Sequence, residues 1–309
     1  MVKKAKTKPK KSSVTNDRVR QLSKKDAKLK AKKEAGKQPP IPGSFRLVAQ
    51  VFEAMKTNWK VLGGIVLVYA ILNAVFASNL LSDLNTSVNN IQHTHNLSAA
   101  FNGYGSLLGG SSGGSQTGSI TQSVLLVLES LVIIWALRQL LASQKIGVKQ
   151  AYYHSMTPLV PFLLVIAMII VQLLPLTLGS ALLALILSST VSSGSLVTLI
   201  FGIFFVALAC WTLYMVSASI FGLYIVTLPD MQPRQALRSA KNLVHFRRWI
   251  VLRRLLFLPI FILLVLGLVT VPLIVVASFL VVPVFFVLLM LTVLFAHTYL
   301  YSLYRGLIA

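Results

Sequence analysis

Six apolar runs, each long enough to cross a lipid bilayer, dominate this sequence. Crossing about 30 Å of hydrocarbon takes about 20 helical residues. With 56% hydrophobic and 12% charged residues, the chain is also more apolar than the surface of a soluble domain could cover. We therefore predict an all-α membrane protein with six transmembrane helices. They lie near residues 61–81, 120–142, 158–187, 196–228, 250–271 and 273–303.

The distribution of positive charge predicts how these helices are oriented, because cytoplasmic segments are enriched in Lys and Arg. No Lys or Arg lies between Lys60 and Arg138, so we expect the Gly-, Ser- and Asn-rich loop at 82–119 outside the cytoplasm. Basic clusters near Lys145 and at 234–254 then mark cytoplasmic segments. Outside and cytoplasmic segments alternate along the chain without exception. It predicts a multi-pass protein of the cell inner (plasma) membrane with both termini in the cytoplasm.

A similar amphipathic segment precedes the first, third and fifth apolar runs. In the first segment Phe45, Val48, Phe52, Met55 and Trp59 fall on one helical stripe, at the spacing of an amphipathic helix. Each unit of the chain would then be an interfacial helix followed by a transmembrane hairpin. The transmembrane domain at 44–309 is thus predicted to contain three such units, at about 44–143, 145–228 and 232–305.

These amphipathic segments supply the candidates for lipid contact. Interfacial helices place Lys and Arg over anionic headgroups while aromatic side chains reach below them. Membrane lipids with anionic headgroups are therefore the predicted partners. In the alternative hypothesis the segments are only the cytoplasmic ends of long spans. The candidates are Arg46, Lys56, Trp59, Lys60, Lys145, Lys149, Arg234, Arg238, Lys241, Arg247, Arg248, Trp249, Arg253 and Arg254.

The first 43 residues form a Lys-rich tail that is nearly free of aliphatic side chains. Such a composition buries too little apolar surface to offset the entropy of ordering, so we predict a disordered cytoplasmic tail. We favour weak adhesion to anionic lipids and control of topology as its role. Nucleic acid, including ribosomes, is a possible but less favoured partner, because the tail has no aromatic residue for base stacking.

Short motifs in the second half resemble one membrane domain family. This domain precedes the catalytic part of some bacterial glycerophosphodiester phosphodiesterases and also occurs in stand-alone six-helix relatives. The resemblance implies a membrane module over about residues 44–305, and it carries over no catalytic residue because the catalytic barrel is absent here. The motifs are Leu228-Pro229-Asp230-Met231, Ala236-Leu237-Arg238-Ser239-Ala240 and Arg247-Arg248-Trp249.

Glu129 is the one acidic residue well inside an apolar run. A carboxylate in hydrocarbon costs about 2.5 kcal/mol or more and usually faces a bundle interior or a hydrated cavity. One hypothesis makes Glu129 the proton or cation site of a transporter or channel-like protein. The other, which we favour, makes it a structural group that joins helices by hydrogen bonds to Gln172, Ser130 or a tyrosine hydroxyl.

No enzymatic motif accompanies these features. Gly-x-Ser-x-Gly occurs as Gly109-Gly110-Ser111-Ser112-Gly113 and once more one residue later, but inside the Gly- and Ser-rich loop and not at a strand-to-helix turn, and there is no phosphate-binding Gly-Lys-Ser/Thr loop. His93 and His95 have too few neighbouring ligands for a metal site, and Cys210 is the only cysteine. We predict no catalytic residue, no metal and no cofactor. The favoured function is a non-enzymatic, lipid-interacting or membrane-scaffold module. The alternatives are a transporter that uses Glu129 and an insertion or assembly factor whose basic tail contacts ribosomes.

Overall fold

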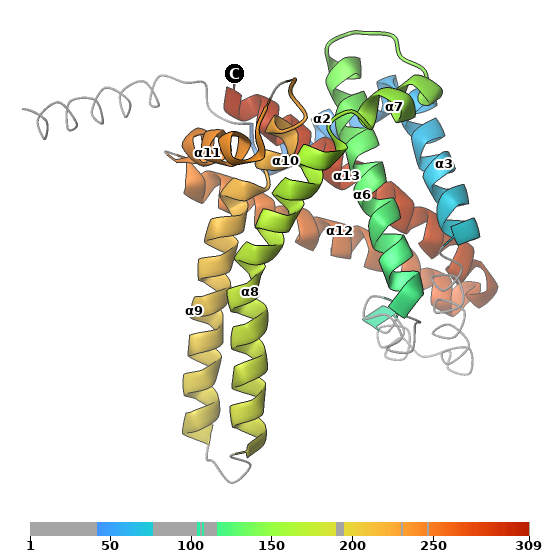
Figure 1. The fold of residues 1–309 in the computed structure, drawn as a ribbon. Coiled ribbons are helices and arrows are strands. Elements are labelled where there is room, and N and C mark those ends of the chain that lie inside the picture. The colour runs from blue at the N-terminus through green and yellow to red at the C-terminus, as the bar shows by residue number, and fades with distance from the viewer. Residues whose placement is uncertain are drawn as a thin grey trace, which may run out of the picture. The chain divides into compact units, whose positions relative to one another are not determined.

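The computed structural model describes residues 42–76, 104–105, 107, 116–189, 195–229, 231–245 and 247–308 (Figure 1). Residues Pro42–Ile308 form one compact unit, and every regular element described in it is helical. The predicted disordered tail, up to residue 41, and most of the predicted outer loop lie outside the described residues.

Six of the described helices are long and apolar enough to cross a membrane. They match the six predicted runs one for one, which confirms an all-helical, multi-pass membrane protein. Their cores are nearly pure aliphatic and aromatic sequence, the composition that a hydrocarbon environment requires. The long helices are α3 (Trp59–Phe76), α6 (Gln116–Leu141), α8 (Leu159–Ser189), α9 (Ser195–Ser219), α12 (Arg248–Val276) and α13 (Val281–Ile308).

Three shorter helices precede α3, α8 and α12, namely α2 (Ser44–Thr57), α7 (Val148–Ser155) and α11 (Pro233–Val244). Each is separated from the long helix that follows. Asn58 leaves the helical conformation with φ −111° and ψ 24° between α2 and α3. A turn that ends at Pro158 separates α7 from α8, and Arg247 leaves the helical conformation with φ −125° and ψ 19° before α12. These segments are therefore separate helices and not extensions of the long ones.

The short helices pack in a cyclic order on the pairs of long helices. α7 contacts α6 and α3, whereas α11 contacts α8 and α9. α2 contacts mainly α13, the last long helix, although it precedes α3 in the chain. Each short helix thus lies on the preceding pair, and the first lies on the last pair. Figure 1 shows α2, α7 and α11 at the same end of the long helices.

The long helices share one apolar core unequally. One core cluster of buried residues draws mainly on α3, α6, α12 and α13, and includes Ile65, Val132, Leu266 and Phe285. The α8 and α9 helices pack chiefly on each other, and α8 touches α6 only sparingly. Only 11% of the membrane-spanning stretch of α8 is buried, against 44% for α6. Of the six candidate spans, α8 is therefore the one least buried in the described unit.

Several boundaries differ from the sequence prediction. The predicted run 196–228 is divided into α9, which ends at Ser219, and a short helix, α10 (Gly222–Ile225). The turn expected at residue 272 lies at 277–280, because α12 continues through Pro272 to Val276 and a short 3₁₀ helix, η1 (Ser278–Leu280), follows. A proline removes one backbone hydrogen bond, which neighbouring helices can compensate in a membrane span. At the predicted outer loop, α6 already begins at Gln116, and the Tyr104 hydroxyl donates to the Leu263 carbonyl at 2.7 Å.

Candidate functional site

A buried polar cluster lies where α3, α6 and α7 meet. Glu129 of α6 is 2% exposed, and its Oε2 accepts a hydrogen bond of 2.8 Å from the Tyr152 hydroxyl on α7. The same hydroxyl lies 3.3 Å from the Ile65 carbonyl oxygen of α3. Burial, and then the charge of Glu129, raise the pKa of Tyr152, so this phenol stays a donor. Tyr152 therefore joins three helices through one hydroxyl.

Two oxygens of this region have no hydrogen-bond partner among the residues that the structure describes. Glu129 Oε1 and Asn73 Oδ1 are both buried and unpaired, although Asn73 Nδ2 donates to the Tyr69 carbonyl at 3.0 Å. Of the three kinds of partner suggested for Glu129, the structure supplies a tyrosine hydroxyl. Gln172 instead accepts from Ser219 at 2.6 Å.

A second polar cluster lies on the other side of α6, around His297 of α13. Ser130 Oγ donates to the Leu126 carbonyl at 2.7 Å and lies 2.9 Å from His297 Nε2. Because the serine proton is already used, the arrangement fits a histidine that donates from Nε2 and accepts at Nδ1 from the Tyr224 hydroxyl, 3.3 Å away. The spacing of His297, Tyr301 and Tyr304 on one helical face was the available signal for an internal role.

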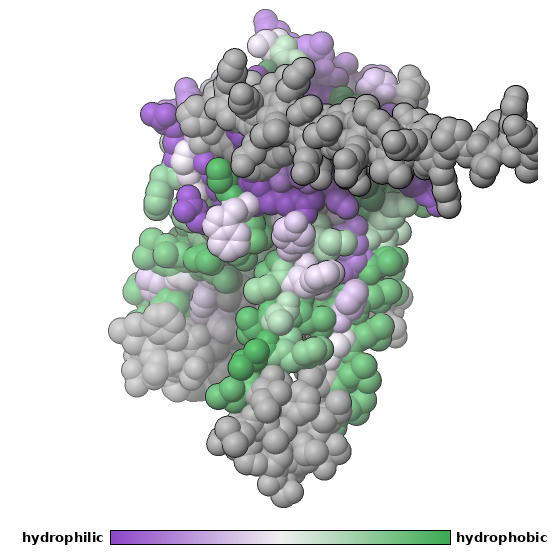
Figure 2. All heavy atoms as spheres, turned by 90° about the vertical axis from the view of Figure 1, so that its left-hand side faces the viewer, coloured by the Kyte–Doolittle hydropathy of each residue, from purple (hydrophilic) through white to green (hydrophobic). Residues whose placement is uncertain are grey.

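The lipid-contact candidates gather at the end of the unit where the short helices lie, here called the basic face. Figure 2 shows hydrophilic residues concentrated at that end and hydrophobic residues over much of the remainder. Arg247 and Arg248 are half-buried, and the Arg248 guanidinium lies 4.7 Å from the centre of the Tyr214 ring. The exposed members are Arg46, Lys56, Trp59, Lys60, Lys145, Lys149, Arg234, Arg238, Lys241, Trp249 and Arg253.

Arg254 is the exception among these candidates, since it is 7% exposed. Its neighbour Arg253 lies on the exposed face of α12, because consecutive residues of a helix point about 100° apart. Arg254 is therefore removed from the set of surface cations.

Only part of the apolar stripe expected on α2 packs against the rest of the protein. Leu47, Val48 and Val51 are buried, whereas Phe45 is 76% exposed and Phe52 is 56% exposed. Trp59, Tyr153 and Trp249 are exposed in the same way, close to the cations of the basic face. The short helices therefore bury one apolar edge in the unit and leave large aromatic side chains uncovered.

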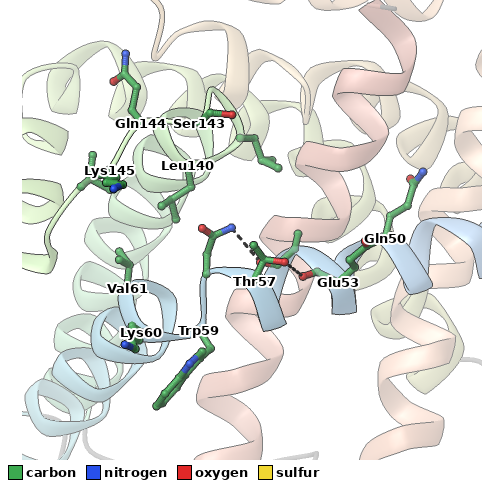
Figure 3. Close-up of a pocket in the computed structure, with 14 residues that line it drawn as sticks. Gln50, Glu53, Thr57, Trp59, Lys60, Val61, Leu140, Ser143, Gln144 and Lys145 are labelled. Atoms are coloured by element: carbon green, nitrogen blue, oxygen red, sulfur yellow. Dashed lines mark hydrogen bonds between the residues drawn. The ribbon is translucent and has the colours of Figure 1, made fainter.

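Two clefts open on the basic face, on either side of the turn that joins α6 to α7. Cleft 1 has a volume of about 800 Å³. In Figure 3 Gln50, Glu53 and Thr57 line it from α2, and Gln144 and Lys145 line it from the turn. The Thr57 hydroxyl donates to the Glu53 carbonyl at 2.9 Å, which closes the end of α2. Cleft 1 carries charges of both signs beside apolar side chains such as Leu140 and Ile146.

Cleft 2 has a volume of about 790 Å³ and lies between α6, α7 and residues 226–232. Arg138 Nη1 donates to the Thr227 carbonyl at 2.6 Å, which fixes its guanidinium at the wall. The Trp135 and His154 rings stack with centroids 5.8 Å apart. Further amide side chains line it, namely Gln139, Gln144, Gln150 and Gln232.

Metal ligation has no support in the part of the chain that the structure describes, where no group of three or more His, Cys, Asp or Glu side chains could hold an ion. His93 and His95 lie outside the described residues. Cys210 is exposed on α9 as a free thiol.

Fold and site together define a polytopic α-helical membrane protein with a basic, cleft-bearing face and a buried polar core. No family model, curated protein or solved structure matches the chain. The resemblance to the membrane domain of glycerophosphodiester phosphodiesterases therefore stays a hypothesis.

Proposed function

We propose that this protein is a non-enzymatic membrane module whose basic face lies in the cytoplasm and binds anionic lipid headgroups of the inner (plasma) membrane. One observation supports this most directly. Exposed Lys and Arg side chains accompany exposed aromatic rings on or beside each of the three short helices. Cations attract anionic headgroups, and aromatic rings partition to the interface below them.

The positions of the short helices also support this proposal. They precede the first, third and fifth candidate spans, and successive spans cross the membrane in opposite directions. All three short helices then lie on one side, where their charges act together. Each Lys or Arg near an anionic surface contributes about 1 kcal/mol, so a set of this size would hold several lipids around the protein.

The orientation predicts a clear result with topology reporters. A periplasm-dependent reporter inserted after Gly110 should be active, and the same reporter after Ala309 should be silent. The reason is that Lys and Arg gather on the side of the short helices, which the positive-inside rule assigns to the cytoplasm. Reporter activity per unit of expressed protein is the measurement. An active fusion after Ala309 would reverse the proposed orientation.

Neutralising one short helix should weaken the preference for anionic lipid. Replacing Arg234, Arg238 and Lys241 together by Gln removes three exposed charges from α11, and the selectivity should fall by up to about 100-fold at about 1 kcal/mol per charge. The protein is extracted from vesicles of equal phosphatidylglycerol and phosphatidylcholine, and the retained lipids are counted by mass spectrometry. The matched control exchanges Arg for Lys and Lys for Arg at the same positions. Equal phosphatidylglycerol retention by all three proteins would contradict the proposal.

The unpaired Glu129 Oε1 supports a second candidate, a proton or cation carrier. A buried acceptor without a donor is where an ion or a proton would be held. This candidate is weaker, because the other carboxylate oxygen already holds α7 through Tyr152. The third hypothesis, an assembly factor with a ribosome-contacting tail, depends on residues outside those described.

A further inference from the structure

Cleft 1 brings an acidic side chain together with two lysines on a face that is otherwise basic. Of the residues that the structure describes, only Glu53 and Glu129 are acidic, and Glu129 is buried inside the bundle. Glu53 lines cleft 1 from α2, whereas Lys60 lines it from the start of α3 and Lys145 from the turn between α6 and α7. The one acid described on the basic face thus lies in the cleft that also holds these two cations.

The opposite charges of cleft 1 lie on different sides of it. Figure 3 shows Gln50 and Glu53 on one side and Lys60 and Lys145 on the other. All four side chains are exposed, so each of them can contact a ligand. The helix ends add to this polarity, because α2 ends one turn after Glu53 and α3 begins next to Lys60. A helix carries a partial negative charge at its C-terminus and a partial positive charge at its N-terminus.

The remaining lining of cleft 1 favours a lipid over a water-soluble ligand. Val61, Leu140 and Ile146 line it beside the charged groups, and Trp59 at its edge is 65% exposed. Exposed tryptophans of membrane proteins concentrate at the level of the headgroups. The start of α3 and the end of α6, both candidate spans, line the cleft, so it lies where the protein meets the membrane surface. The glycerol and first methylenes of a lipid would cover the apolar side chains.

We propose that cleft 1 binds the headgroup of one phosphatidylethanolamine molecule from the leaflet next to the basic face. The phosphate contacts Lys60 and Lys145, and the primary ammonium donates to the side-chain oxygens of Glu53 and Gln50. Phosphatidylglycerol has no cation to meet Glu53, and the quaternary ammonium of phosphatidylcholine has no N–H to donate. The inference goes beyond the proposed function, because a zwitterionic lipid gains little from the positive charge of the whole face and needs both charges in one place.

Vesicles of equal phosphatidylethanolamine and phosphatidylcholine with the same acyl chains test this site. Neither lipid carries a net charge, so the general attraction of the basic face for anionic lipid does not enter the measurement. The protein is extracted from the vesicles in detergent, and the retained lipids are counted by mass spectrometry. Phosphatidylethanolamine should be enriched about fivefold over phosphatidylcholine, the upper value for an ion pair between exposed groups.

Substitutions test the two sides of the cleft separately. Glu53→Gln should lose most of the enrichment, because a neutral amide replaces the carboxylate. Lys56→Gln is the matched control, since Lys56 is an exposed charge of the same helix that does not line the cleft, and it should keep the enrichment. Lys60→Gln combined with Lys145→Gln should lower the retained phosphatidylethanolamine about fivefold. All four side chains are exposed, and the midpoint of thermal unfolding checks that each variant stays folded.

Equal retention of the two lipids by the unchanged protein would overturn this site. An enrichment that survives in Glu53→Gln, or that Lys56→Gln removes to the same extent, would do the same. Glycerophosphoethanolamine, the headgroup without acyl chains, should not displace the retained lipid, and displacement would show that the cleft takes a soluble ligand instead. Replacing Arg234, Arg238 and Lys241 by Gln should leave the enrichment unchanged, so this site and the binding of anionic lipid by the basic face can fail separately.

Discussion

Tyr152→Phe should destabilise the protein by about 1.5–3 kcal/mol, the range for a hydrogen bond to a charged group. The hydroxyl is the partner of Glu129 Oε2, at 2.8 Å, and Glu129 Oε1 has no partner. Removing the hydroxyl therefore leaves a buried carboxyl group with no donor at either oxygen. The measurement is the midpoint of thermal unfolding in detergent, followed by size-exclusion chromatography.

The paired variant Glu129→Met with Tyr152→Phe should be more stable than Tyr152→Phe alone. Replacing both partners by apolar groups of similar shape removes the desolvation penalty together with the hydrogen bond. Glu129→Gln is the matched control, because its amide oxygen still accepts from Tyr152. If the paired variant is the least stable of the three, Glu129 does not act mainly through Tyr152. A stable paired variant with normal growth and lipid retention would argue against the carrier hypothesis.

Gly64→Leu should destabilise the protein by about 1–3 kcal/mol through overpacking between α3 and α7. A Cβ built on Gly64 would lie 2.6 Å from Val148 Cγ2. Valine is branched at Cβ and has few alternative rotamers, so α7 itself would have to move. The midpoint of thermal unfolding in detergent should therefore fall.

Gly63→Leu is the matched control for this prediction. Gly63 is exposed, and no atom lies within 4 Å of its added Cβ. Leucine there should be neutral or slightly stabilising, since it is a much better helix former than glycine. Equal effects of Gly63→Leu and Gly64→Leu would show that α7 does not dock on α3 through Val148.

Both predictions concern α7, the shortest of the three helices on the basic face. Its eight residues form too few turns to be stable alone. Buried Ala151 and Ser155, the Tyr152 hydroxyl and the Val148 contact with Gly64 therefore hold it in place. Since α7 also borders cleft 2, it connects the polar cluster inside the bundle with the basic face.

The cyclic packing of the short helices agrees with a chain built from three similar units. α7 lies on α3 and α6, α11 lies on α8 and α9, and α2 completes the order on α13. Such an order lets every amphipathic helix bury an edge on a pair formed by another unit. The spacing of the three units could be predicted from the sequence. The pair of long helices on which each short helix packs could not, because all pairs present equally apolar surfaces.

The sequence alone determined the number of long helices and the start of each of the three units of the chain. Apolar run length and proline position act locally, so α3, α6, α8, α9, α12 and α13 could all be predicted. It misplaced the turn at residue 272 because a proline in a membrane helix does not end it when neighbours compensate.

Tertiary structure alone decided the sites. The pairing of Glu129 with Tyr152, the burial of Arg254 beside exposed Arg253, and the sparing contact of α6 with α8 are all long-range. A membrane helix is apolar on every side, so its sequence says little about which face meets protein and which meets lipid. Only the packed arrangement shows which faces of the six apolar runs are buried between helices and which stay exposed.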